Sequence, residues 1–139
     1  MESWNEITQG EKIMLFSLSW TLNGVGGNCD NPLWSDVEIK VLALRNEYGT
    51  ITLDIHDNDT GPQMLQIRAE AGNYLVMLGE IVNDDYEVRT YYNKKSTTEM
   101  VCILGDYWPN NQIITDFSFV TLVVSEFFHT GNVQKKLLS

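Results

Sequence analysis

The sequence predicts a single α+β domain, residues 1–139, in which two helices cover one face of an antiparallel sheet of about five to six strands. Short segments with alternating apolar and polar residues follow one another through the middle of the chain. The links between them are only a few residues long, which favours antiparallel neighbours in a meander. Segments with apolar residues at helical spacing flank this run, and such helices bury their apolar stripe against a sheet.

The N-terminal part predicts one strand and one helix. Apolar residues at every second position in 13–20 indicate the first strand, and the Gly- and Asn-rich segment 22–31 indicates a loop. Asn31 is expected to cap the helix that follows, with Pro32 at its first position and Gly49 at its end or in the turn beyond. The buried stripe of this helix is expected to hold Trp34, Val37, Val41 and Leu44.

The central alternation predicts five further strands. They are expected at 50–57, 63–69, 74–82, 86–92 and 100–105, with a loop over 106–112.

The last element, at about 115–129, reads as a helix because Phe117, Val120 and Val124 share one helical face. Asp116 can cap its start and Gly131 follows its end. Its many β-branched residues leave a strand as the alternative. The ends of the chain are expected to be flexible, at 1–11 and 133–139.

Charge and hydropathy limit the classes of partner and the cellular location that we expect for this protein. Nine Lys and Arg against nineteen Asp and Glu give a net charge of −10. Such a surface repels nucleic acid and attracts a basic partner, although acidity also serves solubility. The sequence has no apolar run of about 20 residues and no basic, apolar leader, so we expect a cytoplasmic protein without a membrane contact. The two cysteines are expected to be free thiols.

The stretch DIHDNDTG, residues 54–61, concentrates three carboxylates and His56. A helix-loop-helix calcium site needs Gly at position 6 and Glu at position 12, and these positions hold Pro62 and Arg68 when counted from Asp57. We therefore expect a hairpin turn, with an acidic partner-binding tip as the second interpretation and a metal site as the third. No metal or cofactor is expected.

Catalytic motifs are incomplete. Gly24–Gly27 follows a strand, but Cys29 stands where a dinucleotide fingerprint needs its third glycine. Sequence spacing does not exclude a nucleophilic pair of Cys29 with His56 or His129, because such partners meet only in the folded structure. An enzyme is therefore kept as the third hypothesis, and a non-enzymatic protein is expected.

The candidate binding residues are acidic turn residues and one aromatic loop. Carboxylates on turns can steer a basic partner, and rigid aromatic side chains anchor interfaces. Trp108 has a second interpretation, in which it folds back to cap the sheet core. The candidates are Asp57, Asp59, Asp84, Asp85, Glu87, Asp106, Tyr107 and Trp108.

The chain resembles the bacterial immunity proteins of polymorphic toxin systems, in particular their first-numbered family. The resemblance lies in four segments and their order along the chain: PLWSDVEIKVLAL, GTITLDI, GNYLVMLGE and FSFVTLVVSEFFHTG. The resemblance implies a binding protein that neutralises a cognate toxin in the cytoplasm, and many such toxins are nucleases with basic surfaces. The alternative is a structural or regulatory interaction domain without a toxin partner, in which two copies associate through the uncovered sheet face.

Overall fold

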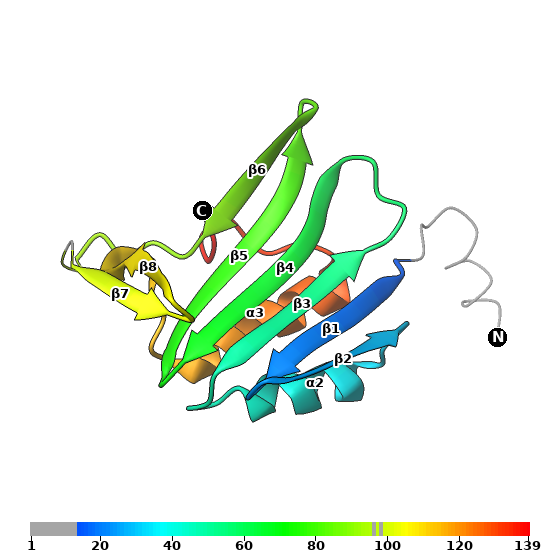
Figure 1. The fold of residues 1–139 in the computed structure, drawn as a ribbon. Helices are drawn as coiled ribbons and strands as arrows, with labels where there is room; N and C mark the ends of the chain where they lie inside the picture. The colour runs from blue at the N-terminus through cyan, green and yellow to red at the C-terminus, as the bar shows by residue number, and fades with distance from the viewer. Residues whose placement is uncertain (1–13, 96, 98) are drawn as a thin grey trace.

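Six antiparallel strands form the main sheet, in the order β2–β1–β3–β4–β5–β6 (Figure 1). The computed structural model describes residues 14–95, 97 and 99–139. The sheet strands are β1 (Phe16–Leu22), β2 (Val25–Asp30), β3 (Gly49–Ile55), β4 (Gly61–Glu70), β5 (Asn73–Val82) and β6 (Asp85–Thr90). The other elements are α2 (Trp34–Ala43), β7 (Met100–Ile103), β8 (Asp106–Pro109), the 3₁₀ helix η1 (Asn110–Gln112) and α3 (Phe117–Thr130). The predicted α+β class is confirmed.

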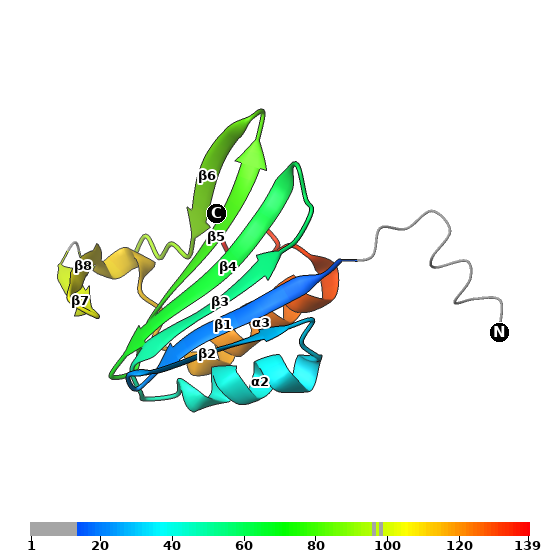
Figure 2. The ribbon, with the colours of Figure 1, turned by 45° about the vertical axis from the view of Figure 1, so that its right-hand side comes forward.

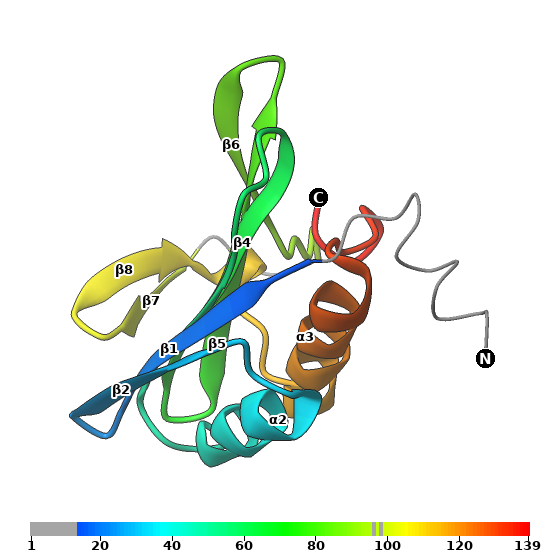
Figure 3. The ribbon, with the colours of Figure 1, turned by 90° about the vertical axis from the view of Figure 1, so that its right-hand side faces the viewer.

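Both helices lie against the same face of the sheet (Figure 3). In β3 the residues Ile51, Leu53 and Ile55 point to the helices and are buried, and the polar residues between them are half-buried on the other side. Val120 and Val124 of α3 meet this layer and are fully buried. The alternation therefore leaves one face of the sheet without a helix, which we call the open face.

The predicted loop 22–31 is wrong, because most of it is β2. Asn23 and Gly24 both have positive φ and form a two-residue turn between Leu22 and Val25. Asn-Gly is the preferred sequence for such a turn, since it matches the twist of the paired strands. The sequence did not indicate the strand because four of its six residues, VGGNCD, are Gly, Asn or Asp, which are poor strand formers.

The start of α2 also differs from the prediction. Asn31 has a positive φ and ends the β2 segment, while Leu33 is the N-cap residue. The Leu33 N–H donates to Oδ2 of Asp36 at 2.8 Å, so the first-turn acid replaces the predicted Asn cap. The C-cap is Leu44, and Gly49 is the first residue of β3 rather than the helix end.

The last helix is confirmed with both of its caps. Oδ1 of Asp116 accepts a hydrogen bond from the Ser118 N–H at 3.0 Å. Gly131 is left-handed, with φ of 80°, and closes α3. None of the described helices has the length and apolar character needed to cross a membrane.

The fifth strand of the predicted central run does not join the meander. β7 pairs with β8 as a separate two-stranded hairpin, and β8 and η1 occupy the predicted loop 106–112. Ile103 of the hairpin and Ile113, which follows η1, pack against Leu75 of β5. Leu75 lies on the open face, so the hairpin covers one end of that face.

The C-terminal tail is packed, contrary to the predicted flexible end over 133–139. Val133 is 2% exposed and Leu138 is fully buried. The Ser139 N–H donates to the Thr90 oxygen at 3.0 Å, and Arg89 holds the tail from β6. These apolar side chains complete the core beneath the sheet edge. The other predicted flexible end, 1–11, lies outside the described residues.

Candidate partner-binding surface

Two turns bring acidic side chains to one end of the sheet. The β3–β4 loop holds Asp57 and Asp59, and the β5–β6 turn holds Asp84 next to Asp85. The two turns lie at the same end because Gly61 pairs with Ile81 across β4 and β5. Thr60 Oγ1 also donates to the Ile81 oxygen at 3.3 Å. These four acids and Glu87 are exposed, and we call the group the acidic end.

The β3–β4 connection is a closed turn, as the favoured interpretation of DIHDNDTG predicted. Asn58 Nδ2 donates to the Pro62 oxygen at 2.8 Å, and Gln63 Nε2 donates to the Asn58 oxygen at 2.8 Å. Asp57 has a positive φ, which Asp tolerates better than most residues. Among the residues that the structure describes, no three His, Cys, Asp or Glu side chains are grouped to hold a metal ion.

The β5–β6 turn follows from its sequence, because Asn83 and Asp84 both adopt positive φ in a two-residue turn. Tyr86 follows this turn on the open face. A Cβ added to Gly79 would lie 1.8 Å from the Tyr86 hydroxyl oxygen, so the phenol ring lies over Gly79. Tyr86 is nevertheless 58% exposed, and Val88 beside it is 53% exposed. The acidic end therefore borders an exposed apolar patch, Tyr86 and Val88, which was not predicted from the sequence.

Asp54 lies further along the open face, between Ser17 of β1 and Met64 of β4. Partial burial raises the pKa of the Asp54 carboxyl above its ordinary value, and the nearby His56 opposes this with a smaller effect. Desolvation disfavours the charged form of a carboxyl.

The aromatic loop occupies a different place. Asp106 accepts a hydrogen bond from Nη2 of Arg68 at 2.9 Å, and this ties the β7–β8 hairpin to β4. Trp108 packs on the cluster of Leu75 and Ile103, as its second interpretation predicted. Its Nε1 is buried and has no hydrogen-bond partner among the described residues. Tyr107 points away and is 68% exposed.

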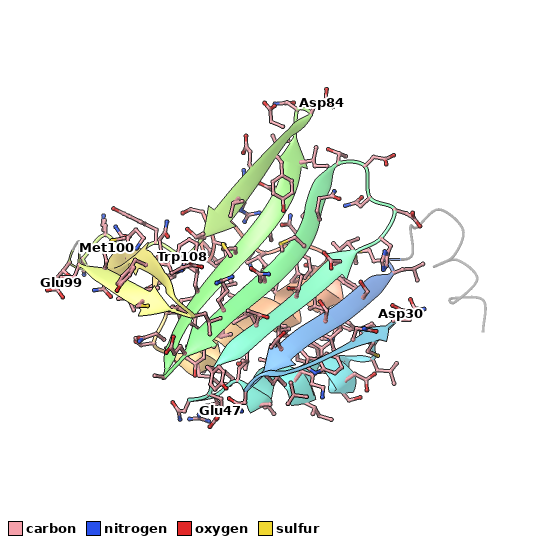
Figure 4. The ribbon with its side chains drawn as sticks, viewed as in Figure 1. Asp30, Glu47, Asp84, Glu99, Met100 and Trp108 are labelled. Carbon is pink, nitrogen blue, oxygen red and sulfur yellow. The ribbon has the colours of Figure 1, made fainter. Side chains whose placement is uncertain are left out.

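The predicted acidic turn residues and the predicted aromatic loop therefore lie apart, near different ends of the sheet. Arg68, which holds Asp106, pairs with Thr50 and Leu75 near the end of β4 that is remote from Gly61. Figure 4 shows Asp84 at the outer tip of the β5–β6 turn and Trp108 on the hairpin, well away from it. The missed residues Tyr86 and Val88 could have been found from the sequence, because YEV places two apolar side chains on one face directly after an acidic turn.

These features define an α+β protein with a six-stranded antiparallel sheet, two helices on one face and an acidic end beside an open face. The chain belongs to the DUF6911 family, a family of unknown function, whose model matches residues 4–137. A crystal structure of a hypothetical protein from Neisseria gonorrhoeae is similar, with a TM-score of 0.74 and 22% sequence identity over 88% of this chain and 92% of that chain. A likeness at this identity shows a shared fold. No curated protein matches the chain.

Proposed function

We propose that this protein is a small acidic immunity protein of the cytoplasm, which neutralises a cognate bacterial toxin by binding it directly. The observation that supports the proposal is the acidic end, where exposed carboxylates border the exposed side chains of Tyr86 and Val88. Interfaces place aromatic anchors centrally and charged groups at the rim. In this protein the aromatic side chain of Tyr86 and the charged carboxylates lie at the same end of the sheet.

Charge supports a basic partner. The net charge of −10 speeds the approach of a positively charged surface. A toxin that acts on nucleic acid carries such a surface over its substrate path, because the substrate is polyanionic. An acidic protein that docks there blocks the substrate by occupying its place. The resemblance of the sequence pattern to immunity proteins supports the same proposal.

Growth rescue tests the proposal directly. The neighbouring genes are searched for a large secreted protein encoded immediately upstream, and the C-terminal domain of such a protein is expressed as the toxin in a bacterial host with or without the full chain. We expect growth to stop with the toxin alone and to resume when the chain is present. Absence of such a toxin gene from the neighbourhood, or continued growth arrest in the presence of the chain, would refute the proposal.

A matched pair of variants tests the acidic end. The first variant removes three charges at this end, Asp59→Asn, Asp84→Asn and Glu87→Gln, and the second removes three exposed charges elsewhere, Glu38→Gln, Glu47→Gln and Glu99→Gln. Both variants have the same net charge. We expect the first to lower the association rate with the toxin, and its dependence on salt, more than the second. Equal effects would show that only the overall charge matters.

The second candidate is an interaction domain that associates with its own copy through the open face. The exposed side chains of Leu15, Tyr86 and Val88 favour it. However, the β1 residues between Leu15 and the far end of this face are Ser17, Ser19 and Thr21, so the apolar area is interrupted. Light scattering on the full chain decides between a monomer, expected for the toxin-binding protein, and a dimer.

A further inference from the structure

The β2 edge of the sheet, opposite to the β6 edge, has a row of backbone N–H and C=O groups that point away from the sheet. Of these groups the Asp30 oxygen accepts a weak hydrogen bond from Sγ of Cys29 at 3.7 Å. Within the described part of the chain, β2 pairs with β1 alone. Leu22 and Val25 flank a two-residue turn, so they form a hydrogen-bonded pair. Along β2, every second residue from Val25 onward therefore directs its backbone N–H and C=O groups toward β1. Gly26, Asn28 and Asp30 therefore direct their N–H and C=O groups away from β1. The Asn31 N–H points inward to the Phe16 oxygen at 3.0 Å, which agrees with this register.

Natural proteins protect such edges, and β2 lacks the usual devices. Lysine, proline and inward-pointing charges block the addition of a further strand. In VGGNCD the only charge is Asp30 at the end of the strand (Figure 4). Gly26 and Gly27 have no side chains that would obstruct an approaching backbone.

A groove runs beside this edge, on the face that the helices cover. α2 follows the sheet next to β2 (Figure 2), and a cavity of about 270 Å³ lies between them. The ring of Trp20 forms part of its wall by lying over Gly27, where an added Cβ would be 2.4 Å from the ring. Lys40 Nζ lies 4.2 Å from the centroid of this ring. The lining residues are Leu18, Trp20, Cys29, Asp36, Ile39 and Lys40.

The outer lip of this groove is apolar and exposed. Ile39 is 62% exposed, and on the strand side Val25 is 69% exposed. Within the groove the carboxylate of Asp36 is balanced by the ammonium group of Lys40, so the negative charge of the site comes from Asp30 on the other face of the strand. The site therefore combines hydrogen-bonding groups for a backbone, an apolar groove for alternate side chains, and negative charge.

We propose that β2 and this groove bind an extended segment of a partner protein by strand addition. The segment lies antiparallel or parallel to β2 and bonds to Gly26, Asn28 and Asp30. Its alternate side chains are apolar and enter the groove, and the side chains between them are basic and face Asp30. Main-chain bonds supply affinity in this mode of recognition and the groove supplies specificity. The site lies at the β2 edge, whereas the acidic end lies at the β3–β4 and β5–β6 turns, so the site is separate from the proposed toxin-binding surface.

A second copy of this chain fits the groove poorly. If β2 of another molecule paired with this edge, its groove-facing residues would be Val25, Gly27 and Cys29. The central one, Gly27, has no side chain to fill the cavity. Each copy also carries a net charge of −10, which opposes the association. These two facts favour a basic, apolar segment of another protein.

Selection from a random library of 12-residue peptides displayed on phage tests the proposal. The full chain is the bait, the variant Ile39→Asp is used for counter-selection, and Leu122→Asp is the matched control because Leu122 is an exposed residue of α3. We expect enriched peptides with apolar residues at every second position and Lys or Arg between them. They should bind the wild-type chain and Leu122→Asp equally and bind Ile39→Asp at least roughly tenfold more weakly. Failure to enrich any peptide that distinguishes Ile39→Asp would overturn the proposal.

N-methylation of an enriched peptide tests the backbone pairing without altering the protein. Methyl groups on the amides that face β2 should reduce affinity roughly tenfold or more, since they remove donors and block the approach, while methyl groups on the intervening amides should have little effect. Equal losses for both sets would exclude strand addition. A dimer of the wild-type chain that Ile39→Asp dissociates would assign the groove to a second copy instead.

Discussion

Nε of Arg89 donates a hydrogen bond to the backbone oxygen of Leu138 at 2.9 Å, and this bond joins β6 to the end of the chain. The same guanidinium donates to the Val133 oxygen at 2.5 Å and to Oδ1 of Asn132 at 3.2 Å. Glu80 lies 3.5 Å away as the buried counter-charge. Arg89 is only 5% exposed, so its charge depends on these partners.

Replacement of this arginine should destabilise the fold strongly. In Arg89→Met the tail carbonyls lose their donors and Glu80 keeps a buried charge without its counter-charge. We expect the free energy of unfolding to fall by about 3–5 kcal/mol, as measured by urea titration. Arg68→Met is the comparison, because the Asp106 partner of Arg68 is 62% exposed, and it should cost less than about 1 kcal/mol. Similar losses for both variants would contradict the role given to Arg89.

The packed tail makes a second prediction. Leu138 is fully buried although it is the residue before the last one. Leu138→Ala should cost about 2–5 kcal/mol, because it removes buried methyl groups and leaves a cavity. Lys136→Ala, at an exposed position of the same tail, should change stability by less than about 0.5 kcal/mol. A tail that contributed nothing to the core would make the two variants alike in thermal unfolding.

The elements that could be predicted are those with a complete local signal. The strand at 50–57 alternates strictly, and the helix at 115–129 has an acid before it and a glycine after it. β2 was missed because its two glycines and its asparagine conceal the alternation, although Asn23-Gly24 marks a hairpin turn. The tail was missed because its burial depends on Arg89, which lies 49 positions from Leu138.

Sequence patterns also locate the turn residues of the candidate site, but they do not show how these turns are arranged in space. The sequence identifies turns, so Asp57, Asp59 and Asp84 were found as exposed turn acids. It does not show which turns share an end of the sheet, because that depends on strand register. Asp84 and Trp108 were both predicted as binding residues, and nothing in the sequence indicated that they lie apart as they do in the structure.

The indole nitrogen of Trp108 allows a prediction about the hairpin. Nε1 is buried and makes no hydrogen bond to any described residue, so the ring contributes through packing on Leu75 and Ile103. Trp108→Phe should keep most of this packing and cost about 1 kcal/mol, whereas Trp108→Ala should cost about 3 kcal/mol. Urea titration of both variants gives the comparison. Equal losses would show that the indole N–H carries the stability.

Asp54 should make stability depend on pH in a defined direction. Burial raises the pKa of this carboxyl, so the folded protein binds its proton more tightly than the unfolded chain does. The ionised form therefore opposes folding above the raised pKa, and this cost is absent below the ordinary carboxyl pKa. Asp54→Asn should stabilise the protein at about pH 7, and the gain should vanish at about pH 3. The exposed Asp59→Asn is the control and should show no such gain at neutral pH. A gain for Asp54→Asn that persisted in acid would exclude this cause.

Gly79 and Tyr86 should be coupled, because the phenol ring occupies the space that any side chain at position 79 would need. In Gly79→Ala the new Cβ would lie 1.8 Å from the hydroxyl oxygen and 2.5 Å from Cζ, so the ring must leave the open face. We expect a loss of about 1–3 kcal/mol from this overpacking. If Tyr86 anchors the toxin as proposed, the same variant should also weaken binding while every carboxylate of the acidic end is kept.

A double-mutant cycle separates this steric effect from a general intolerance of alanine at position 79. With Tyr86→Ala in place the obstruction is gone, and Gly79→Ala should then be neutral or stabilising, because alanine loses less backbone entropy than glycine on folding. The interaction energy from the four urea titrations should reach at least about 0.5 kcal/mol. The nearby Cγ of Met64, 3.3 Å from the added Cβ, belongs to a flexible side chain that can move away. If the stability losses of the two single variants simply added in the double variant, the position of the Tyr86 ring would not depend on the absence of a side chain at Gly79.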